Sequence, residues 1–182
     1  MQTAVLDAAR AIKRDRYPDA AVMFAAGSLV RGEGSAFSDL DLVVVYSTLP
    51  TAYRESFRFD GYPVEAFVHD PQTLEYFCVT IDRTSGCPAL PQMVAEGLEI
   101  PRPTTLSASL KARAVAIIHA GPPPLDVETD RRRRYVISDL LDDLRGVGSR
   151  NEVVATGTRL YEELADYYLR RNGYWSGRGR RS

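Results

Sequence analysis

The sequence predicts an α+β protein, in which an N-terminal α/β lobe with a mixed sheet is followed by a C-terminal helical bundle. Short apolar runs bounded by Gly and Pro, which are typical of buried strands, lie in the first half of the chain. The second half consists mainly of longer segments with apolar residues at helical spacing. Between the two, residues 88–103 contain four prolines. We therefore expect two parts, residues 1–100 and 101–182.

The N-terminal part is expected to begin with an amphipathic helix. Val5, Ala8, Ala9 and Ile12 recur at helical spacing, and this pattern ends near Pro18. Three apolar runs then predict strands, because each is bounded by residues that favour turns. These runs are residues 20–26, 40–46 and 62–69.

The segments that follow are predicted to be helical. The stretch PQTLEYFCVTIDR begins with Pro71, and proline is tolerated in the first turn of a helix. A short helix, PQMVAEG, is expected inside the proline-rich connector. Three longer helices are predicted at residues 106–120, 128–146 and 151–172, where each pattern ends at a glycine or proline signal.

The last two helices carry apolar stripes, which we assign to the core of the helical bundle. The final residues, 175–182, are small and basic, and we expect them to form a flexible tail. The stripes consist of Val136, Ile137, Leu140, Leu141 and Leu144 in one helix and of Val153, Val154, Leu160, Tyr161, Leu164 and Tyr168 in the other.

Composition and charge favour an ordinary globular protein. Of its 182 residues, 45% are hydrophobic and 26% are charged, and the formal net charge of -1 nominates no polyanionic partner. Cys78 and Cys87 are expected to be free thiols, because one pair in a chain of this size is not the dense framework of small secreted domains. No apolar run approaches the ~20 residues of a membrane span, and the N-terminus lacks the apolar core of a secretory signal. We therefore expect a cytoplasmic protein that does not contact a membrane.

Two aspartates, Asp39 and Asp41, stand at the start of the apolar run LDLVVVY. Because side chains alternate along a strand, both carboxylates point to one face of it and Leu40 points to the other. Like charges repel each other, and a divalent cation between them removes this conflict. Mg²⁺ is usually held by one or two carboxylates together with the phosphates of a substrate. The pair therefore predicts a Mg²⁺ site to which a nucleotide supplies further ligands.

Gly27 and Ser28 lie at the end of the preceding predicted strand, and ten residues separate them from this pair. A glycine there allows the backbone to approach a phosphate closely, and Ser28 adds a hydroxyl donor. If a helix begins at Leu29, its free N–H groups face the same anion. Arg31 could reach a β- or γ-phosphate from the first turn, or it could be a solvated loop arginine.

The segments Gly27-Ser28, Ser38-Asp39-Leu40-Asp41 and Leu42-Val43-Val44-Val45 together resemble the signature of the polymerase-β-like nucleotidyltransferase superfamily. The small bacterial members, namely the minimal nucleotidyltransferases and the aminoglycoside nucleotidyltransferases of the kanamycin type, are the most similar. The resemblance covers about the first 70 residues. It implies a nucleotidyltransferase catalytic domain at residues 1–100 and a helical domain for binding a substrate or partner at residues 101–182.

The resemblance also implies a third carboxylate on a neighbouring strand, which completes the metal site and often acts as the general base. Glu65 is the candidate, because a charged residue inside an otherwise apolar strand needs a partner. A pair of Mg²⁺ ions would be that partner. The alternative is a salt bridge to an arginine such as Arg31 or Arg58.

The implied reaction transfers a nucleoside monophosphate from a nucleoside triphosphate, with ATP as the most frequent donor in the family, to an acceptor hydroxyl. Pyrophosphate is released. The acceptor would be a small molecule such as an aminoglycoside, or a hydroxyl of a partner protein. The alternative function is a non-catalytic module that keeps the fold and binds a nucleotide or a protein. Small relatives often form dimers, so the sequence leaves a homodimer open.

Other charged residues are assigned to the surface. The run Arg131–Arg134 could contact a nucleic acid backbone, but acidic residues flank it, and a solvated helix face is favoured. Nucleic acid is therefore not an expected partner. Asp142 and Asp143 could bind a cationic acceptor, although exposed helix charges are the simpler interpretation. His69 shares a strand face with Glu65 and is assigned no catalytic role.

Overall fold

A computed structural model of the chain describes residues 2–35, 37–146 and 148–176. The chain divides into two compact units. The sheet unit comprises Met1–Asp82 and Pro88–Ala120, and the hairpin unit comprises Arg83–Cys87 and Gly121–Ser182. The predicted functional division at residue 100 stays a prediction. The final part of the predicted basic tail, residues 177–182, lies outside the described residues.

The sheet unit is built on five strands in the order β3-β4-β2-β1-β5. Strands β2 and β4 are parallel, and the other neighbouring pairs are antiparallel, so the sheet is mixed as the sequence predicts. The strands are β1 (Val22–Ala26), β2 (Leu40–Val45), β3 (Tyr53–Phe59), β4 (Tyr62–His69) and β5 (Leu98–Ile100).

The central strands form because nearly every residue in them is apolar and buried on both faces of the sheet. All residues of β1 and β2 are buried, as expected for strands covered on both sides. The edge strand β3 is different, because its side chains are alternately exposed and half-buried. Neither β3 nor the three-residue strand β5 was predicted from the sequence.

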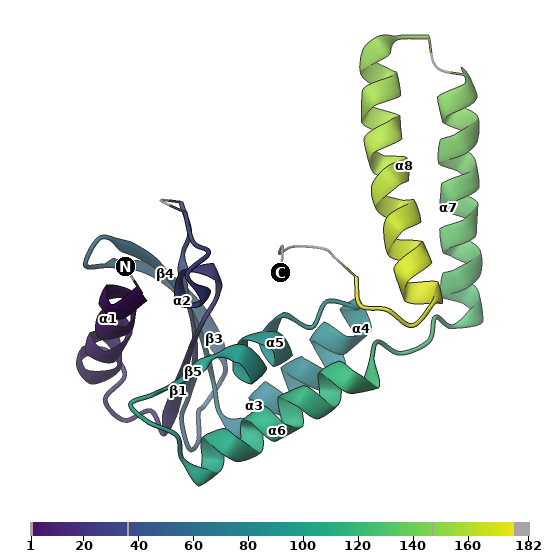
Figure 1. Cartoon of the computed structure of the whole chain (residues 1–182). Helices are drawn as coiled ribbons and strands as arrows, with labels where there is room; N and C mark the ends of the chain where they lie inside the picture. Colours follow the sequence, from purple (N-terminus) through teal and green to yellow (C-terminus); the bar gives the residue numbers. More distant parts are fainter. Residues whose placement is uncertain (1, 36, 147, 177–182) are drawn as a thin grey trace. The chain divides into compact units, whose positions relative to one another are not determined.

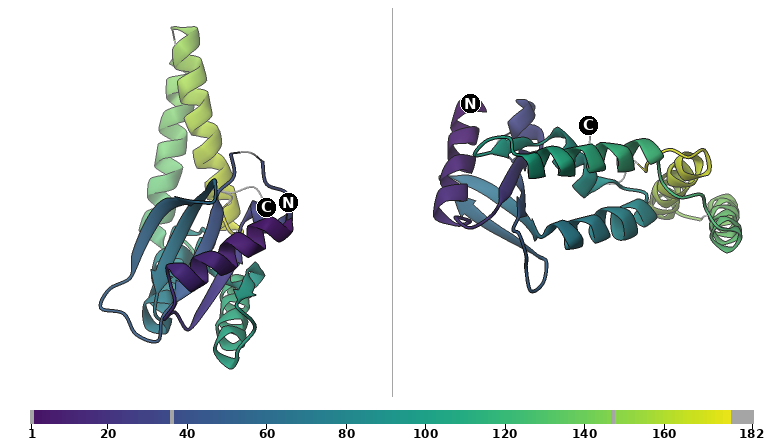
Figure 2. Two further views of the ribbon diagram at one scale, coloured as in Figure 1. Left: turned by 90° about the vertical axis from the view of Figure 1, so that its left-hand side faces the viewer. Right: turned by 90° about the horizontal axis from the view of Figure 1, so that it is seen from below.

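Helices cover the two faces of this sheet and create two apolar cores (Figures 1 and 2). On one face, α1 contributes Val5, Ala9 and Ile12 to a cluster with Leu42 and Val44. On the other face, helices α3, α5 and α6 pack against side chains of β1 and β2 such as Phe24 and Val43. The predicted amphipathic first helix is therefore confirmed.

The helices of the sheet unit lie close to their predicted positions. Asp70 caps α3, since its carboxylate accepts a hydrogen bond from Thr73 N at 2.8 Å. The helical segment then widens into a short π-helix before it enters the hairpin unit. The helical elements of the sheet unit are α1 (Gln2–Asp15), α2 (Ser28–Arg31), α3 (Pro71–Tyr76), η1 (Phe77–Asp82), α5 (Ala89–Glu96) and α6 (Thr105–Ala120).

The hairpin unit contains two long antiparallel helices, α7 (Val127–Gly146) and α8 (Arg150–Arg171), and the short α4 (Arg83–Ser85). Polar contacts join the long helices near their connection to the rest of the unit. Tyr167 donates a hydrogen bond to Asp130 at 3.0 Å, and Arg133 forms an ion pair with Asp166. Arg134 also pairs with Asp130, at 2.7 Å. Two of the four arginines in the run Arg131–Arg134, namely Arg133 and Arg134, therefore form ion pairs within the hairpin.

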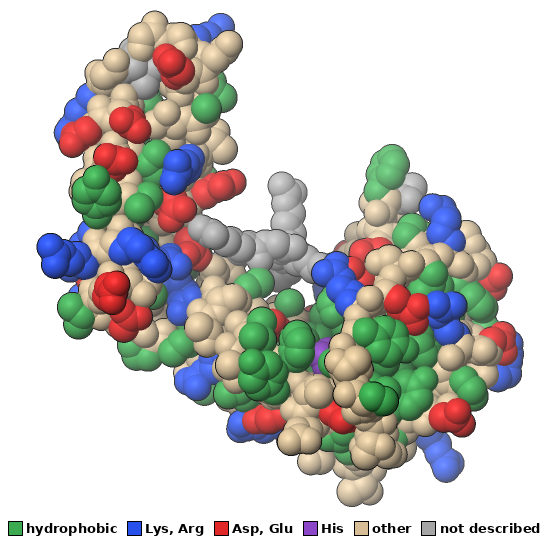
Figure 3. All heavy atoms as spheres, turned by 180° about the vertical axis from the view of Figure 1, so that it is seen from behind, with side chains coloured by type: hydrophobic (Ala, Val, Ile, Leu, Met, Phe, Trp, Pro, Cys, Tyr) green, Lys and Arg blue, Asp and Glu red, His purple; other side chains and the backbone are tan. Residues whose placement is uncertain are grey.

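The apolar stripe of α8 is not core in this hairpin, although the sequence analysis assigned it there. A hairpin of two helices buries only the sides that face each other, and most side chains of the stripe are exposed. In the α7 stripe Leu140 is buried as expected, but Leu141 is exposed, so its assignment to the core is wrong. Figure 3 shows hydrophobic side chains between charged ones on the visible face of the hairpin. The exposed side chains of the α8 stripe are Val153, Val154, Tyr161, Leu164 and Tyr168.

Two further expectations concern the cysteines and the membrane. Cys78 and Cys87 are not joined by a disulfide, which confirms the prediction of free thiols. Among the described residues, no helix combines the length and the apolar character needed to cross a membrane.

Candidate metal-binding site

The structure brings Asp39, Asp41 and Glu65 together at one end of the sheet. Each of the three offers a carboxylate oxygen, and these oxygens lie within 4.8 Å of one another. Asp41 and Glu65 are buried, with 1% and 7% of their surfaces exposed, while Asp39 is half-buried. Three converging carboxylates at this spacing match the donors that a hard divalent ion such as Mg²⁺ prefers.

Strand pairing explains this convergence. In the parallel pair β2–β4, Asp41 lies directly beside Glu65, and the same register places Leu42 beside Ala66. Neighbours in register point to the same face of a sheet, so both carboxylates emerge on the face covered by α3, α5 and α6. Asp39 comes two residues before Asp41, just ahead of the first residue of β2, and its side chain follows the same alternation.

Gly27 lies against the Asp41 carboxylate, at a distance that leaves no room for a side chain. A Cβ atom built on Gly27 would lie 2.2 Å from Oδ2 of Asp41, which no real carbon could tolerate. The residue also has φ of 86°, in a region that favours glycine. Glycine is therefore required here both by the backbone conformation and by the close approach of the Asp41 carboxylate.

The segment after Gly27 forms the short helix α2, which begins one residue before Leu29, the start considered from the sequence. Ser28 is its first residue, and Arg31 N donates a hydrogen bond to Gly27 O at 3.2 Å. The Arg31 side chain is bound to two carboxylates, with Nε 2.9 Å from Glu33 Oε2 and Nη1 3.4 Å from Glu96 Oε2. Arg31 is thus held in exposed ion pairs, and contact with a phosphate would require it to exchange these partners.

Glu65 also has an arginine partner, but the partner is neither Arg31 nor Arg58. The guanidinium of Arg54, on β3, donates from Nε to Oε1 of Glu65 and forms an ion pair with the same oxygen through Nη2. Arg58 instead donates to the carbonyl oxygen of Gly61 at 3.2 Å. The sequence analysis missed Arg54 because it did not predict the strand that carries it.

His69 lies on the same strand face as Glu65 but at the other end of β4. It pairs with Val45, four positions along the strands from the pair Asp41 and Glu65, which is about 13 Å away at the usual rise of a strand. Its ring packs edge-on against Phe77 with centroids 5.1 Å apart, and its Nδ1 has no hydrogen-bond partner among the described residues. Burial lowers the pKa of His69. These contacts describe a neutral core histidine.

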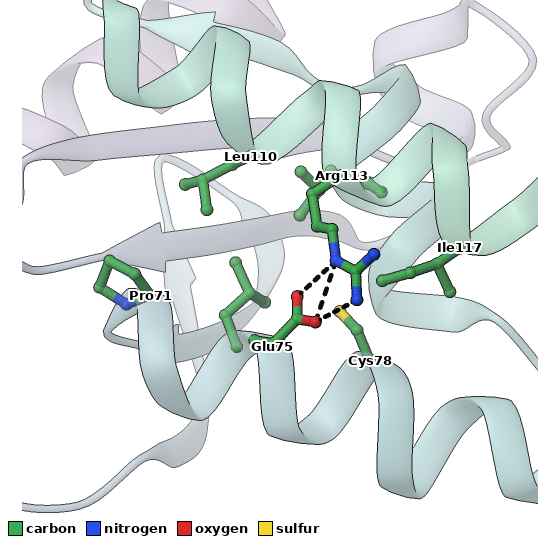
Figure 4. A pocket seen from close by; sticks show the side chains of 9 residues that line it. Pro71, Glu75, Cys78, Leu110, Arg113 and Ile117 are labelled. Atoms are coloured by element: carbon green, nitrogen blue, oxygen red, sulfur yellow. Dashed lines mark hydrogen bonds and ion pairs between the residues drawn. The ribbon is translucent and has the colours of Figure 1, made fainter.

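A small pocket elsewhere in the sheet unit contains none of the predicted site residues (Figure 4). Its cavity volume is about 20 Å³, about enough for one water molecule. Arg113 and Glu75 form a hydrogen-bonded ion pair in its wall, with Nε 2.9 Å from Oε1, and the thiol of Cys78 lies nearby. Burial raises the pKa of this thiol to about 12, so Cys78 is not poised as a nucleophile.

Comparison with known proteins adds little to this description. No family model matches the chain, and no curated protein matches it. A solved structure that is similar to the chain is a nucleotidyltransferase-like protein from Exiguobacterium sibiricum 255-15, with a TM-score of 0.46 and 18% sequence identity. The match covers 93% of this chain and 58% of that one, so the chain spans little more than half the length of that protein. A likeness this distant carries no argument about activity, which must come from the residues of the site.

Proposed function

We propose that this protein is a Mg²⁺-dependent nucleotidyltransferase, which transfers a nucleoside monophosphate from a nucleoside triphosphate to an acceptor hydroxyl. The observation that carries the proposal is the convergence of Asp39, Asp41 and Glu65 within 4.8 Å, beside a glycine that the Asp41 carboxylate requires. Carboxylates this close to one another repel, and a divalent ion bound between them relieves the repulsion. The donor set therefore fits one or two divalent ions.

The chain's residues divide the chemistry among them. Asp39 and Asp41 would hold the ions, and Glu65 would complete the site and accept the proton of the attacking hydroxyl. Bound Mg²⁺ supplies the charge that activates the hydroxyl and stabilises the leaving pyrophosphate. The acceptor oxygen forms a bond to the α-phosphorus, and the bond from that phosphorus to the bridging oxygen of the β-phosphate breaks.

The nucleotide would be bound through its triphosphate. Gly27 and Ser28 lie at the turn that precedes Asp39 and Asp41, and Arg31 follows one turn of helix later. Ser28 can donate a hydroxyl hydrogen bond, and Arg31 can contribute positive charge once it exchanges its present carboxylate partners. We propose ATP as the donor, on the basis of the family resemblance alone.

The acceptor is proposed to be a small hydroxylated molecule such as an aminoglycoside, or a hydroxyl of a partner protein. Within this proposal, residues 1–100 form the catalytic domain and residues 101–182 bind the acceptor or the partner. A homodimer belongs to the same proposal, and the exposed apolar side chains of α8 support it because an unpaired helix face of this kind is typical of an interface.

The decisive experiment tests transfer and its dependence on the carboxylates. The purified chain is incubated with Mg²⁺ and each of the four nucleoside triphosphates labelled at the α-phosphate, and a panel of aminoglycosides and candidate proteins is screened for label. Asp39→Asn and Asp41→Asn keep the shape of the side chains but remove the charge. We expect both variants to lose transfer by at least about 100-fold, as removal of essential electrostatic groups usually does.

The result that contradicts the proposal is transfer that persists unchanged in both variants. Binding of Mg²⁺ and nucleotide with no transfer to any acceptor would instead favour the non-catalytic binding module. Asp60→Asn is a suitable control, because Asp60 lies in the turn between β3 and β4 and is not part of the carboxylate group.

A further inference from the structure

Arg54 is in direct contact with the carboxylate triad, and the proposed reaction gives it no role. Its guanidinium contacts Oε1 of Glu65 through both Nε and Nη2. The two side chains differ sharply in environment, since Arg54 is 63% exposed and Glu65 only 10%. A charge from the surface thus reaches a nearly buried carboxylate.

The position of Arg54 on the sheet is fixed by two further features. In the antiparallel pair β3–β4, Arg54 lies beside Phe67 and Ser56 lies beside Glu65, so Arg54 is the diagonal neighbour of Glu65 on the same face. Its guanidinium carbon also lies over the Phe67 ring, 5.0 Å from the centroid. Stacking of this kind restrains an arginine that would otherwise move freely in solvent.

This geometry has an electrostatic consequence for metal binding. A guanidinium beside Glu65 neutralises part of the negative charge of the triad before any metal arrives. The same guanidinium repels a divalent cation held by the same carboxylates. Glu65 is buried on β4, an inner strand of the sheet, so its side chain already has little conformational freedom. Arg54 therefore gains little for metal binding by orienting Glu65, and its repulsion of the ion is the larger effect.

We propose that Arg54 is the resident counter-ion of the triad: it compensates Glu65 in the metal-free protein and competes with the divalent ion for the same carboxylate. This inference rests on the proposed metal site. In it, Arg54 lowers the affinity of that site for a divalent ion. The metal site is then tuned to bind weakly on its own, and the triphosphate that accompanies the ion supplies the remaining attraction.

The test measures metal affinity directly. Binding of Mn²⁺, followed by the electron paramagnetic resonance signal of the free ion, is compared in the unmodified chain, in Arg54→Gln and in Arg54→Lys. We expect Arg54→Gln to bind Mn²⁺ about tenfold more tightly, because a nearby positive charge is removed. Arg54→Lys keeps the charge and should stay within about threefold of the unmodified chain.

Arg58→Gln is the matched control. Arg58 lies on the same strand and contacts a backbone carbonyl oxygen, so its replacement changes the net charge by the same amount without touching Glu65. Its Mn²⁺ affinity should be unchanged. Thermal unfolding gives a second readout: the metal-free Arg54→Gln protein should unfold at a lower temperature, and Mn²⁺ should raise its midpoint more than it raises that of the unmodified chain.

The outcomes separate this inference from the proposed function. Equal Mn²⁺ affinities in Arg54→Gln and Arg58→Gln, or weaker binding in Arg54→Gln, would overturn the role of Arg54 while leaving the metal site intact. If neither the unmodified chain nor Arg54→Gln binds Mn²⁺, or if Asp41→Asn leaves Mn²⁺ binding unchanged, the metal site itself is wrong and both proposals fail.

Discussion

Gly27 is the residue on which the geometry of the site depends most directly. Its hydrogen atom faces Oδ2 of Asp41, and any side chain would have to displace that carboxylate. The substitution Gly27→Ala therefore imposes two separate costs. One is backbone strain at φ of 86° and ψ of -179°, a region essentially restricted to glycine, about 1–3 kcal/mol. The other is a steric clash, about 1–3 kcal/mol.

Gly61→Ala separates these two costs. Gly61 has a similar φ of 84°, but an added Cβ would meet nothing within 4 Å. We expect Gly61→Ala to lower the free energy of unfolding by the strain alone and to leave Mn²⁺ binding unchanged. Gly27→Ala should lower stability by about 2 kcal/mol more and also weaken Mn²⁺ binding. Equal effects of the two variants in urea denaturation and metal titration would refute the close approach.

His69 predicts a pH dependence of stability. Burial disfavours the charged imidazolium and lowers the pKa of His69 below its ordinary value of 6.5. A depressed pKa in the folded protein means that protons bind more readily to the unfolded chain. The stabilising contribution is therefore complete above pH ~6.5 and is lost progressively as the pH falls below that value.

Urea denaturation between pH ~7.5 and ~5.5 tests this expectation. The unmodified chain should lose stability across this range, and His69→Leu, which cannot be protonated, should show a shallower decline. The substitution keeps an apolar contact with Phe77, and His119 remains in both proteins as an internal reference. A decline of the same steepness in both proteins would show that His69 does not couple folding to pH.

At the scale of elements, the edge strand β3 was not predicted from the sequence, whereas three other strands were. The strands β1, β2 and β4 were predicted because their central residues are apolar. Strand β3 is an edge strand whose sequence, YRESFRF, places charged residues at several positions. The spacing of Tyr53, Phe57 and Phe59 on one face of the strand was a signal for a half-buried strand, but Glu55 interrupts it, and it is weaker than the apolar runs.

Because β3 was not predicted, Arg54, which contacts Glu65, was not predicted as part of the site either. Asp39 and Asp41 could be placed on one face because side chains alternate along a strand. Glu65 became a candidate because the family resemblance implied a third carboxylate on a neighbouring strand. Arg54 could not be predicted, since its contact with Glu65 depends on the register between β3 and β4. Register arises from tertiary pairing and the length of the turn, which the residue pattern of one strand does not contain.

The π-helix η1 and the segment after it make different environments for the two thiols. Cys78 is buried in η1, and its pKa is raised to about 12, whereas Cys87 is half-buried in the loop before α5. Only a thiolate reacts readily with alkylating reagents. In the native protein we therefore expect iodoacetamide at pH ~8 to label Cys87 and to spare Cys78. Mass spectrometry identifies the labelled peptide, and urea should expose both thiols equally; native labelling of Cys78 would contradict its burial.

At the scale of the whole molecule, the exposed stripe of α8 shows a second limit of sequence reasoning. The apolar spacing correctly predicted an amphipathic helix, but it could not tell how many partners the helix would have. Tyr161 is 74% exposed and Leu164 is 49% exposed. A helix period alone does not distinguish a stripe covered within one chain from a stripe covered by another chain.

The predicted homodimer provides a test of this stripe. Tyr161→Glu places a charge in its centre, and we expect the substitution to shift the molar mass from dimer to monomer in light scattering after size-exclusion chromatography, at micromolar concentration. Tyr76→Glu is the control, because Tyr76 is 54% exposed but lies on α3 in the sheet unit. A monomeric unmodified chain, or a dimer that tolerates Tyr161→Glu, would be evidence against pairing through α8.

The parallel pairing of β2 with β4 links the site to folding. Asp41 and Glu65 are 24 positions apart in the chain, and they become neighbours only when these two strands have paired in register. An unfolded chain therefore has no preformed chelate to offer a cation. A divalent ion that binds the triad would select the native state alone. The free energy of unfolding would then rise with the logarithm of the ion concentration once that concentration is well above Kd.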